Sequence, residues 1–340
     1  MPLRALPRTT RATCARSLVA EERVLRTPVA EGERRLALRG PLPPGRSVAA
    51  PAIRGYYIDF RVKTSEPVWP PPWFPWPGFH RFMGVAQWGL GAYERFLAGE
   101  GDAWLGAAAA AAEHLVEQQD GAVGGGWREP IPYVHTFRTG ANWLSAMTQG
   151  QCASLLARVG QETDDERFLD AAQRALHPLR VPISRGGVQA PLGDGIFLEE
   201  YPTDPPSHVL NGGIFALWGA YDVWRTLDDD AAERLFVEAT ATLAANLRRW
   251  DTGFWSRYDL YPHPIRNVAS PSYHTLHIDQ LTVLNALAPA APFAETAARF
   301  IDHSRSPIRR ARSVAHKVAF RAVVRRRLPR PDGTDTTGVR

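Results

Sequence analysis

Four pairs of segments with hydrophobic residues at helical spacing recur along the middle of the chain. In each pair a short polar break separates the two segments, which span 82–97 and 103–116, 143–159 and 166–176, 210–227 and 231–247, and, more weakly, 275–287 and 293–301. Asp102, Asp165 and Asp229 stand at the start of the second segment in three pairs, where an aspartate can cap exposed amide groups. Their near-equal spacing indicates a real repeat, and the pattern predicts four helical hairpins.

The connections between the hairpins are long and rich in glycine and proline. Tetratricopeptide stacking would need a period of about 34 residues, so the pattern does not favour that solenoid. We expect a mainly α fold: an (α/α) toroid or barrel of about four helical hairpins with little β structure. Its long connecting loops would supply one functional face.

Charge divides the chain into three parts. Residues 1–54 hold eleven Arg against four Glu, a net +7, and residues 305–340 hold ten Arg and one Lys against two Asp, a net +9. Because the whole chain carries +5, residues 55–304 carry −11. We predict an Arg- and Pro-rich extension over 1–54, a helical barrel domain over 55–304 and a basic, disordered tail over 305–340.

The basic tail has two interpretations. A basic helix over 309–327 would be attracted to an acidic membrane surface or another polyanion, at about 1 kcal/mol for each Lys or Arg near an anionic surface. A solvated end is the alternative. Nucleic acid is not an expected partner, because the segment offers no run of aromatic stacking platforms between its arginines and no known nucleic-acid-binding motif.

Composition narrows the class of protein further. With 44% hydrophobic and 22% charged residues among 340, the chain can bury a large core. Cys14 and Cys152 are too few for a disulfide framework or a four-thiolate metal site, and no stretch approaches the roughly 20 apolar residues of a membrane span. The first thirty residues lack the apolar core of a signal peptide. We expect a cytoplasmic protein. Whether its tail also makes peripheral contact with the inner membrane stays open.

Whether the protein forms a homodimer also stays open, because the hydrophobic pattern cannot distinguish helix faces that build a barrel from faces that build a dimer.

Two of the connections are aromatic or glycine-rich. In WPPPWFPWPGF at 69–79 the tryptophans could stack on sugar rings or could plug one end of the barrel. The segment GGGW ends at Trp127, which could line the same face. It lacks the Lys-Ser/Thr of a phosphate loop, so nucleotide binding is not supported. His274 and His277 lie three apart, but no Glu stands between them and no third ligand is evident, so we predict neither a metal nor a cofactor.

Several motifs in the remaining connections occur together and in order. They are EEYPT at 199–203, SHVLNG at 207–212, DTG at 251–253, YDL at 258–260 and YHTLHIDQL at 273–281, with AQWGL at 86–90 and SAMTQGQ at 145–151 upstream. Over about residues 56–304 the chain resembles the C-terminal catalytic domain of the D-glucuronyl C5-epimerase family. These enzymes convert D-glucuronate to L-iduronate residues within heparosan-type polysaccharides.

The resemblance implies a set of catalytic residues. Inversion at C5 requires a carbon-bound proton to leave one face of the sugar and another to arrive on the opposite face. By similarity to the family, Glu200 and Tyr273 would stand on opposite faces, while Tyr201 and Tyr258 hold the ring or assist the proton transfer. Which residue abstracts first stays open. A tyrosine is only about 0.1% ionised at neutral pH, so a tyrosinate base needs a nearby cation or strong donors.

Other residues in or near the motifs could bind an acidic uronate-containing polysaccharide. They are His208, Asn211, His274, His277, Trp127, Gln149 and Tyr261. Each has a structural alternative: Asn211 could cap a helix, Glu199 and Glu200 could form a solvated acidic pair, and the tyrosines could be core residues.

The chain departs from the family pattern at one position that bears on the substrate. Where the animal enzymes carry an arginine after the YDL triplet, this chain has Tyr261. The alternatives for neutralising the uronate are Arg138, Arg185, Arg257 and Arg266, each of which could also be a surface charge. Of the β-rich N-terminal portion of the animal enzymes, a short segment around residues 56–60 remains, and it could contain a strand.

A uronate lyase and a non-catalytic binder of acidic glycans stay as alternative functions.

Overall fold

The computed structural model describes residues 53–72, 74, 81–134 and 136–327, with the side chains of 325–327 excepted. Almost all of the predicted N-terminal extension lies outside these ranges, and so do Cys14, the last residues of the tail, and Trp73 and Trp76 of the aromatic connection. Within the described ranges the protein is mainly helical, which confirms the predicted fold class at that level.

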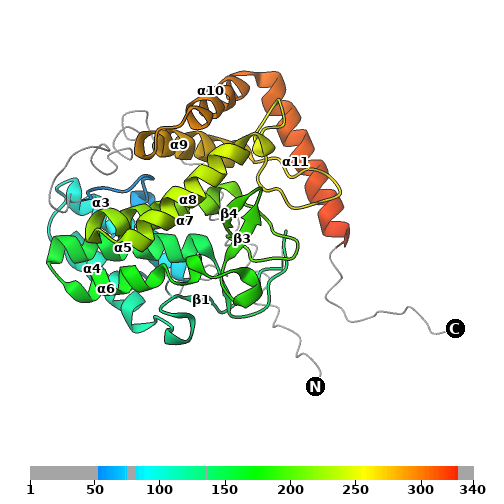
Figure 1. Cartoon of the computed structure of the whole chain (residues 1–340). Helices are drawn as coiled ribbons and strands as arrows, with labels where there is room; N and C mark the ends of the chain where they lie inside the picture. The colour runs from blue at the N-terminus through cyan, green and yellow to red at the C-terminus, as the bar shows by residue number, and fades with distance from the viewer. Residues whose placement is uncertain (1–52, 73, 75–80, 135, 328–340) are drawn as a thin grey trace.

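All four predicted hairpins are present (Figure 1). They are α3 (Arg81–Leu97) with α4 (Ala103–Glu117), α5 (Ala146–Thr163) with α6 (Glu166–Ala175), α7 (Leu210–Leu227) with α8 (Asp230–Asn246), and α9 (Pro271–Leu287) with α10 (Ala291–Arg305). A further helix, α11 (Pro307–Arg327), follows α10. Single 3-10 turns lie at η1 (Arg61–Lys63), η2 (Gly121–Val123), η3 (Pro178–Arg180), η4 (Ile183–Arg185) and η5 (Leu247–Trp250).

Two of the three predicted aspartate caps are made. The side chain of Asp165 accepts a hydrogen bond from the Arg167 amide at the start of α6, and that of Asp229 accepts one from Ala232 in α8. Asp102 makes no such bond, and the prediction for it is wrong. Its backbone is already helical, at φ −65° and ψ −23°, whereas a capping side chain needs extended backbone to turn back onto the following amides.

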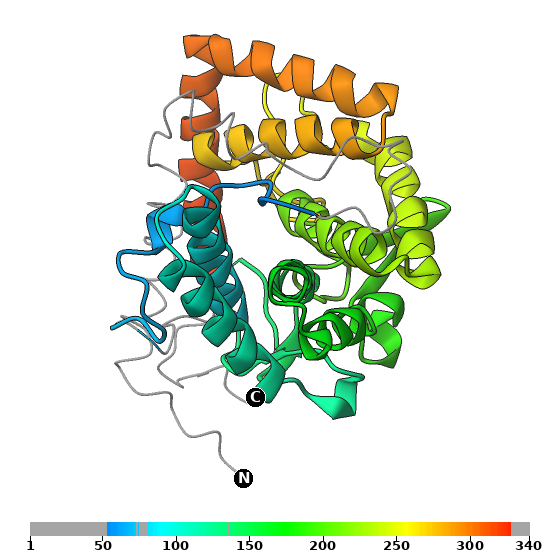
Figure 2. The same ribbon diagram turned by 90° about the vertical axis from the view of Figure 1, so that its left-hand side faces the viewer.

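Helices α3, α5 and α7, the first helices of three hairpins, lie side by side and run in the same direction. Along α3 and α5, Cys152 lies beside the carbonyl of Phe82, and the phenol of Tyr93 further along donates to Glu162 at 2.9 Å. The contacts continue from α5 to α7 and from α7 to α9, with α9 and α10 layered at the top of Figure 2. The starts of α3, α5 and α7, and the long connections that lead into them, therefore gather at one end. Closure of the hairpins into a complete toroid stays a prediction.

Glycines set the spacing between α5 and α7. A Cβ atom on Gly219 would lie 2.4 Å from the Cα of Gly150, and one on Gly150 would lie 2.6 Å from the Cα of Ala216. Distances this short leave no room for a side chain at either position, so the two helix backbones touch directly.

β structure is confined to two short antiparallel pairs, in keeping with the expectation of little β structure. β1 (Arg128–Glu129) pairs with β2 (Trp143–Leu144), and β3 (Gln189–Leu192) pairs with β4 (Gly195–Leu198). β4 ends directly before Glu199, so this hairpin delivers the first motif of the resemblance to the end of the array.

The segment 56–60 is not a strand, contrary to what the sequence suggested. Its polar groups are engaged by helix side chains instead of a neighbouring strand. The phenol of Tyr57 donates to Asp222 at 2.6 Å, and the guanidinium of Arg158 donates to the carbonyl of Gly55 at 2.7 Å. Tyr56 and Tyr57 are buried against Trp218, at the end of α5 and α7 opposite the long connections.

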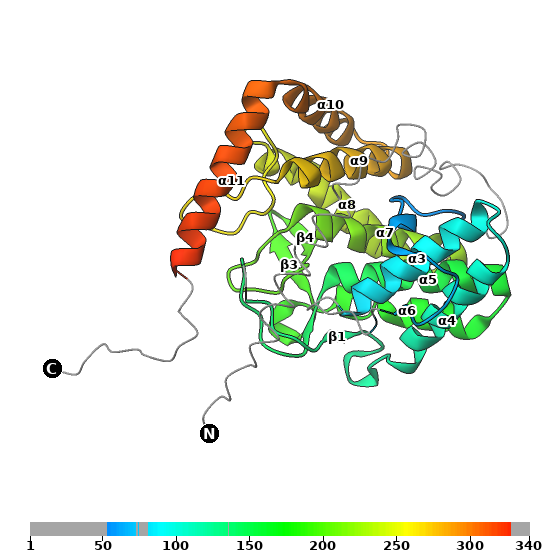
Figure 3. The same ribbon diagram turned by 180° about the vertical axis from the view of Figure 1, so that it is seen from behind.

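Helix α11 lies against the body of the protein, although composition placed a domain boundary just before it. It descends from α10 past the connection that precedes α9, which is visible from both sides in Figures 1 and 3. Ser313 and Phe320 of α11 are buried, and the ammonium of Lys317 donates to Asn267 at 2.7 Å. The first two-thirds of the basic segment thus form a packed helix. No helix of the described residues is long and apolar enough to cross a membrane.

We predict that Glu129 makes the stability of the fold depend on pH. Its fully buried carboxylate accepts hydrogen bonds from the Arg81 amide at 2.6 Å and from the hydroxyl of Thr148 at 2.8 Å, which ties β1 to α3 and α5. Burial nevertheless raises the pKa of Glu129 to about 7. The folded state therefore holds a proton that the unfolded state releases above its pKa near 4.5, and this contribution to stability is lost as pH rises through about 7.

Glu129→Gln should remove this loss, because a neutral side chain cannot titrate. The difference in unfolding free energy between the variant and the wild type should grow by about 3 kcal/mol between pH 4.5 and pH 7.5. Chemical denaturation across this range measures it. Glu117→Gln on the exposed end of α4 is the matched control and should follow the wild type. A parallel pH dependence for Glu129→Gln and the wild type would contradict the prediction.

Candidate active site

The motif residues meet where α5, α7 and α9 begin. Ser145 caps α5 and Ser270 caps α9, each through its side-chain oxygen, and α7 begins after Val209. The segments 199–209 and 251–270 cross this end of the array. The amide of Ala146 donates to the carbonyl of Glu199 at 2.9 Å, and the amide of Leu210 donates to the carbonyl of Tyr258 at 3.1 Å. The three helix starts and the two segments thus form one framework.

Glu199 fixes the segment that leads into α7. Its carboxylate is fully buried and accepts hydrogen bonds from the hydroxyl of Ser207 at 2.5 Å and from the amide of His208 at 2.9 Å. The Nδ1 atom of His208 lies 2.5 Å from the same carboxylate. The backbone of His208 is left-handed, with φ 47°, and this carboxylate holds the unusual turn in place. Glu199 therefore has a structural role that the interpretation as a solvated pair did not foresee.

Glu200 is buried as well, with only 3% of its surface exposed. Its side chain lies against the first turn of α7, where a Cβ atom on Gly212 would come within 2.4 Å of the Glu200 Cβ. The missing side chain at Gly212 creates the space that this carboxylate occupies. Both acids of the pair are thus inside the protein, and the alternative of a solvated acidic pair is wrong.

Tyr201 forms the centre of an aromatic cluster. Its ring stacks on Trp143 with 5.5 Å between the ring centres, and the rings of Tyr133 and Phe137 lie at 4.5 and 5.0 Å. Tyr258 and Tyr261 pack against the edge of this cluster. Tyr201 is therefore held rigidly beside Glu200, with three aromatic neighbours that fix the plane of its ring.

Tyr258 and Tyr273 are neighbours across the end of the array. Their rings meet edge to face with 5.0 Å between centres, and both side chains are only partly buried. The ammonium of Lys317 lies 5.3 Å from the centre of the Tyr258 ring. The sequence predicted the two tyrosines; the structure adds the cation beside them.

The two histidines of α9 differ in their surroundings. His274 stacks on Trp255 at 3.9 Å, and its Nε2 lies 2.9 Å from the Phe300 carbonyl, which can only accept a hydrogen bond. Its Nδ1 must then accept from Ser256, whose hydroxyl lies at 2.7 Å, and burial lowers the pKa of His274 to about 4. His274 thus uses both nitrogens inside the protein.

The two ring nitrogens of His277 differ in their hydrogen bonding. Its Nδ1 lies 3.0 Å from the Ser256 hydroxyl, whereas its buried Nε2 has no hydrogen-bond partner among the described residues. Burial, His274 and Lys317 together lower its pKa well below 6.5, so the ring is neutral at physiological pH. Asn211 and Gln280 show the same feature: Gln280 donates to the Asn211 carbonyl at 3.0 Å, while the side-chain oxygens of both residues are buried without a partner in the described part of the chain.

Trp127 and Gln149 lie deeper and bond to each other. Trp127 is fully buried, its amide donates to the Gln149 side-chain oxygen at 2.9 Å, and its indole donates to the carbonyl of Leu115. The side-chain amide of Gln149 donates in turn to the Trp127 carbonyl. Their polar groups thus hold β1 to α5. Tyr261 lies at the rim, where its ring contacts Phe137 at 5.6 Å.

The arginines considered as partners of a uronate are distributed unevenly. Arg138, Arg185 and Arg266 are exposed on the surface. Arg257 is half-buried near the site, and burial lowers its pKa, partly offset by the charge of Asp259. In the aromatic connection, Trp69 packs on Trp88 and on Phe74, each at 5.0 Å, which favours the plug for this described part.

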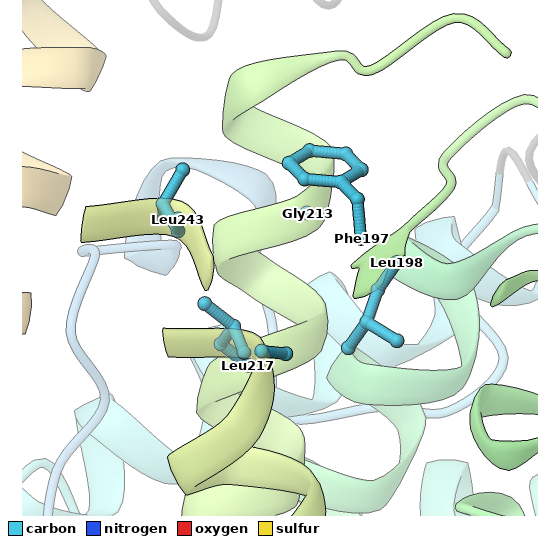
Figure 4. Close-up of a pocket in the computed structure, with 6 residues that line it drawn as sticks. Phe197, Leu198, Gly213, Leu217 and Leu243 are labelled. Carbon is cyan, nitrogen blue, oxygen red and sulfur yellow. The ribbon is translucent and has the colours of Figure 1, made fainter. Parts of the chain in front are cut away.

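The described residues contain no cluster of side chains that would hold a metal ion. No three His, Cys, Asp or Glu side chains in these ranges come together as ligands of one ion would. A small cavity between β4, α7 and α8 is lined by Phe197, Leu198, Gly213, Leu217, Ala239 and Leu243 (Figure 4). Its lining is entirely apolar, so it offers no group for acid-base chemistry.

Lys317, Asn267 and Ser256 are the site residues that the sequence motifs missed. Asn267 and Ser256 lie between motifs, and no spacing rule singles out either. Lys317 lay inside a run of arginines that composition assigned to a tail. Ser313 and Phe320 lie four and three residues from it in α11 and form an inward face with it. This helical spacing was the signal available in the sequence.

Comparison with known proteins agrees with the motifs. The model of the family described as "D-glucuronyl C5-epimerase C-terminus" matches residues 120–302. The chain is 32% identical over 213 residues to a D-glucuronyl C5-epimerase of Caenorhabditis elegans, an alignment that covers 57% of this chain and 34% of that protein. It is 27% identical over 165 residues to an uncharacterized protein of Methanocaldococcus jannaschii, covering 46% of this chain and 50% of that one.

The chain thus spans a third to a half of the length of these curated relatives. The family model nevertheless covers more than half of the chain and contains Glu200, the three tyrosines and the helix starts that hold them. The chain belongs to the D-glucuronyl C5-epimerase C-terminus family.

Proposed function

We propose that the protein is a uronate C5-epimerase that converts D-glucuronate to L-iduronate residues within an acidic polysaccharide. The observation that carries the proposal is the position of a buried glutamate, Glu200, in the framework that also presents Tyr201, Tyr258 and Tyr273. Membership of the epimerase family supports the same conclusion.

The reaction needs two proton-transfer groups and stabilisation of charge. A base removes the C5 proton, and the electron pair that remains is delocalised onto the C6 carboxylate. An acid then delivers a proton to C5 from the opposite face, so the configuration inverts while every bond to oxygen is kept. A lyase would instead expel the substituent at C4 after the same first step.

Glu200 and Tyr273 are the proposed pair on the two faces of the sugar. Glu200 comes from the segment before α7 and Tyr273 from the first turn of α9, so two different elements present them. Tyr201, held in its aromatic cluster, and Tyr258, beside Tyr273, would hold the ring between them. Separate supports suit a reaction that requires groups on opposite sides of one carbon atom.

The surroundings favour a negatively charged sugar. α5, α7 and α9 all begin at this site, and the amide ends of helices carry partial positive charge. The buried side-chain atoms of Asn211, His277 and Gln280 that lack partners in the described ranges are suited to sugar hydroxyls. His208 would contact the substrate from its strained turn. Trp127, Gln149 and His274 would act indirectly, by fixing the elements that carry the site.

We predict exchange at C5 without bond cleavage. Heparosan incubated with the protein in heavy water should lose its C5 proton signal and gain an iduronate anomeric signal in proton NMR. Absorbance in the ultraviolet should stay constant, because no unsaturated sugar forms. Exchange accompanied by new absorbance would identify a lyase. Absence of exchange with heparosan and with a second glucuronan would contradict the proposal for both polymers.

Glu200→Gln should abolish this exchange while it preserves the fold. Glutamine keeps the shape of the side chain and cannot move the proton, so we expect a loss of at least about 100-fold in rate, the lower range of general acid-base contributions. Binding of the polymer, measured by calorimetry, should persist. Equal exchange rates for the variant and the wild type would exclude Glu200 as a proton-transfer group.

Gly212→Ala should have a comparable effect without touching an ionisable group. The added methyl group would overlap the Glu200 side chain and displace it, and a displacement of about 1 Å can reduce turnover about 100-fold. Gly106→Ala is the matched control, because this exposed glycine of α4 has nothing within 4 Å of the added atom. The control should retain full activity and gain up to about 1 kcal/mol of stability. Full activity in Gly212→Ala would show that Glu200 does not need its present position.

A further inference from the structure

Helix α11 brings a positive charge to the site from outside the part of the chain that the family model matches. The match ends at residue 302, and Lys317 lies fifteen residues further on. Its ammonium lies 5.3 Å from the ring centre of Tyr258 and 5.4 Å from that of Phe320. Its charge also contributes to the lowered pKa of His277 on α9. Lys317 therefore faces both the segment before α9, which carries Tyr258, and α9 itself, which carries His277.

Asn267 orients the lysine. The side-chain oxygen of Asn267 accepts from the Lys317 ammonium at 2.7 Å, and its Nδ2 donates to Asp259 at 2.5 Å. The reversed amide would put its NH2 against the ammonium and its oxygen against a carboxylate, so these two neighbours fix its orientation. Asp259 is fully buried and also lies 3.3 Å from His263, which anchors the arrangement to the segment after Tyr258.

The packing of α11 fixes the position of Lys317. Phe320, one turn further along the helix, is buried with its ring edge to face against His263 at 4.9 Å. Ser313, one turn before, is fully buried. The half-buried Lys317 lies between these two contacts, so the helix cannot rotate without breaking one of them.

We propose that Lys317 binds the carboxylate of the uronate substrate. This inference rests on the proposed function, and it names the residue that supplies the positive charge absent at Tyr261. The carboxylate must carry additional charge once the C5 proton has left, and an ammonium beside it stabilises that state. Charge at this point also selects uronates over neutral sugars.

The test compares two ligands, a heparosan decasaccharide and its carboxyl-reduced form, in which glucose replaces glucuronate. Dissociation constants are measured by isothermal titration calorimetry for the wild type, Lys317→Met, Lys317→Arg and Arg310→Met. Arg310 lies exposed on the same helix, so its variant removes one positive charge without touching the site.

Lys317→Met should weaken binding of the native oligosaccharide about 10- to 100-fold, the range of one charge-assisted hydrogen bond. Binding of the carboxyl-reduced form should be unchanged, so the preference for the native ligand collapses. Lys317→Arg should restore part of the preference, and Arg310→Met should match the wild type. A structural role alone would lower the melting temperature and weaken both ligands equally.

The inference is overturned if Lys317→Met keeps the wild-type preference, or if the wild type itself shows none. Exchange at C5 in heavy water is measured on the same samples and reports on the proposed function separately. A preference that depends on Lys317 in a protein without exchange would leave the inference standing and would refute the epimerase. Exchange by the wild type together with an unchanged preference in Lys317→Met would do the reverse.

Discussion

The direct contact between the backbones of α5 and α7 is the constraint on which the site depends. With glycine at positions 150 and 219, no side chain separates the helices, so neither can shift or rotate without a clash. Both helices begin at the site. Because the segment before α7 bonds to the first residue of α5 through the Glu199 carbonyl, the fixed spacing passes directly to Glu200. Packing in the middle of the array thus determines the position of an acid at its end.

The opposite end of the same two helices is closed by a buried ion pair. Arg158 of α5 and Asp222 of α7 lie 2.5 Å apart and are both inaccessible to solvent. Removing one partner of such a pair usually costs about 3–5 kcal/mol, because the other charge is left buried alone. Tyr57 also donates to Asp222, so the segment 53–60 is held across this end. Rigid polar contacts therefore occupy one end of α5 and α7, and the site occupies the other.

Most of the fold and the main candidates for catalysis could be predicted from the sequence, because both rest on local patterns. Helical periodicity determines each hairpin within a few residues, and Glu200 and Tyr273 stand in contiguous motifs. Whether Glu199 is solvated or buried depends on donors that only the folded chain brings to it. The bond from Lys317 to Asn267 joins residues 50 positions apart, and no pattern along the chain encodes that contact. The failed cap at Asp102 has a local cause, since a helical backbone at that residue turns its side chain away.

The tyrosine at position 261 and the lysine of α11 are connected through one run of aromatic contacts. The ring of Tyr261 packs at a tilt against His263 with 4.7 Å between ring centres, and the ring of His263 in turn contacts Phe320 of α11 edge to face. A long, flexible arginine at position 261 would place charge where this apolar surface now supports the helix. Because Phe320 and Lys317 share the inward face of α11, the contact that anchors the helix also brings the ammonium to Tyr258. The same run of contacts thus fixes the ring of Tyr261, the helix α11 and the ammonium of Lys317 in one arrangement.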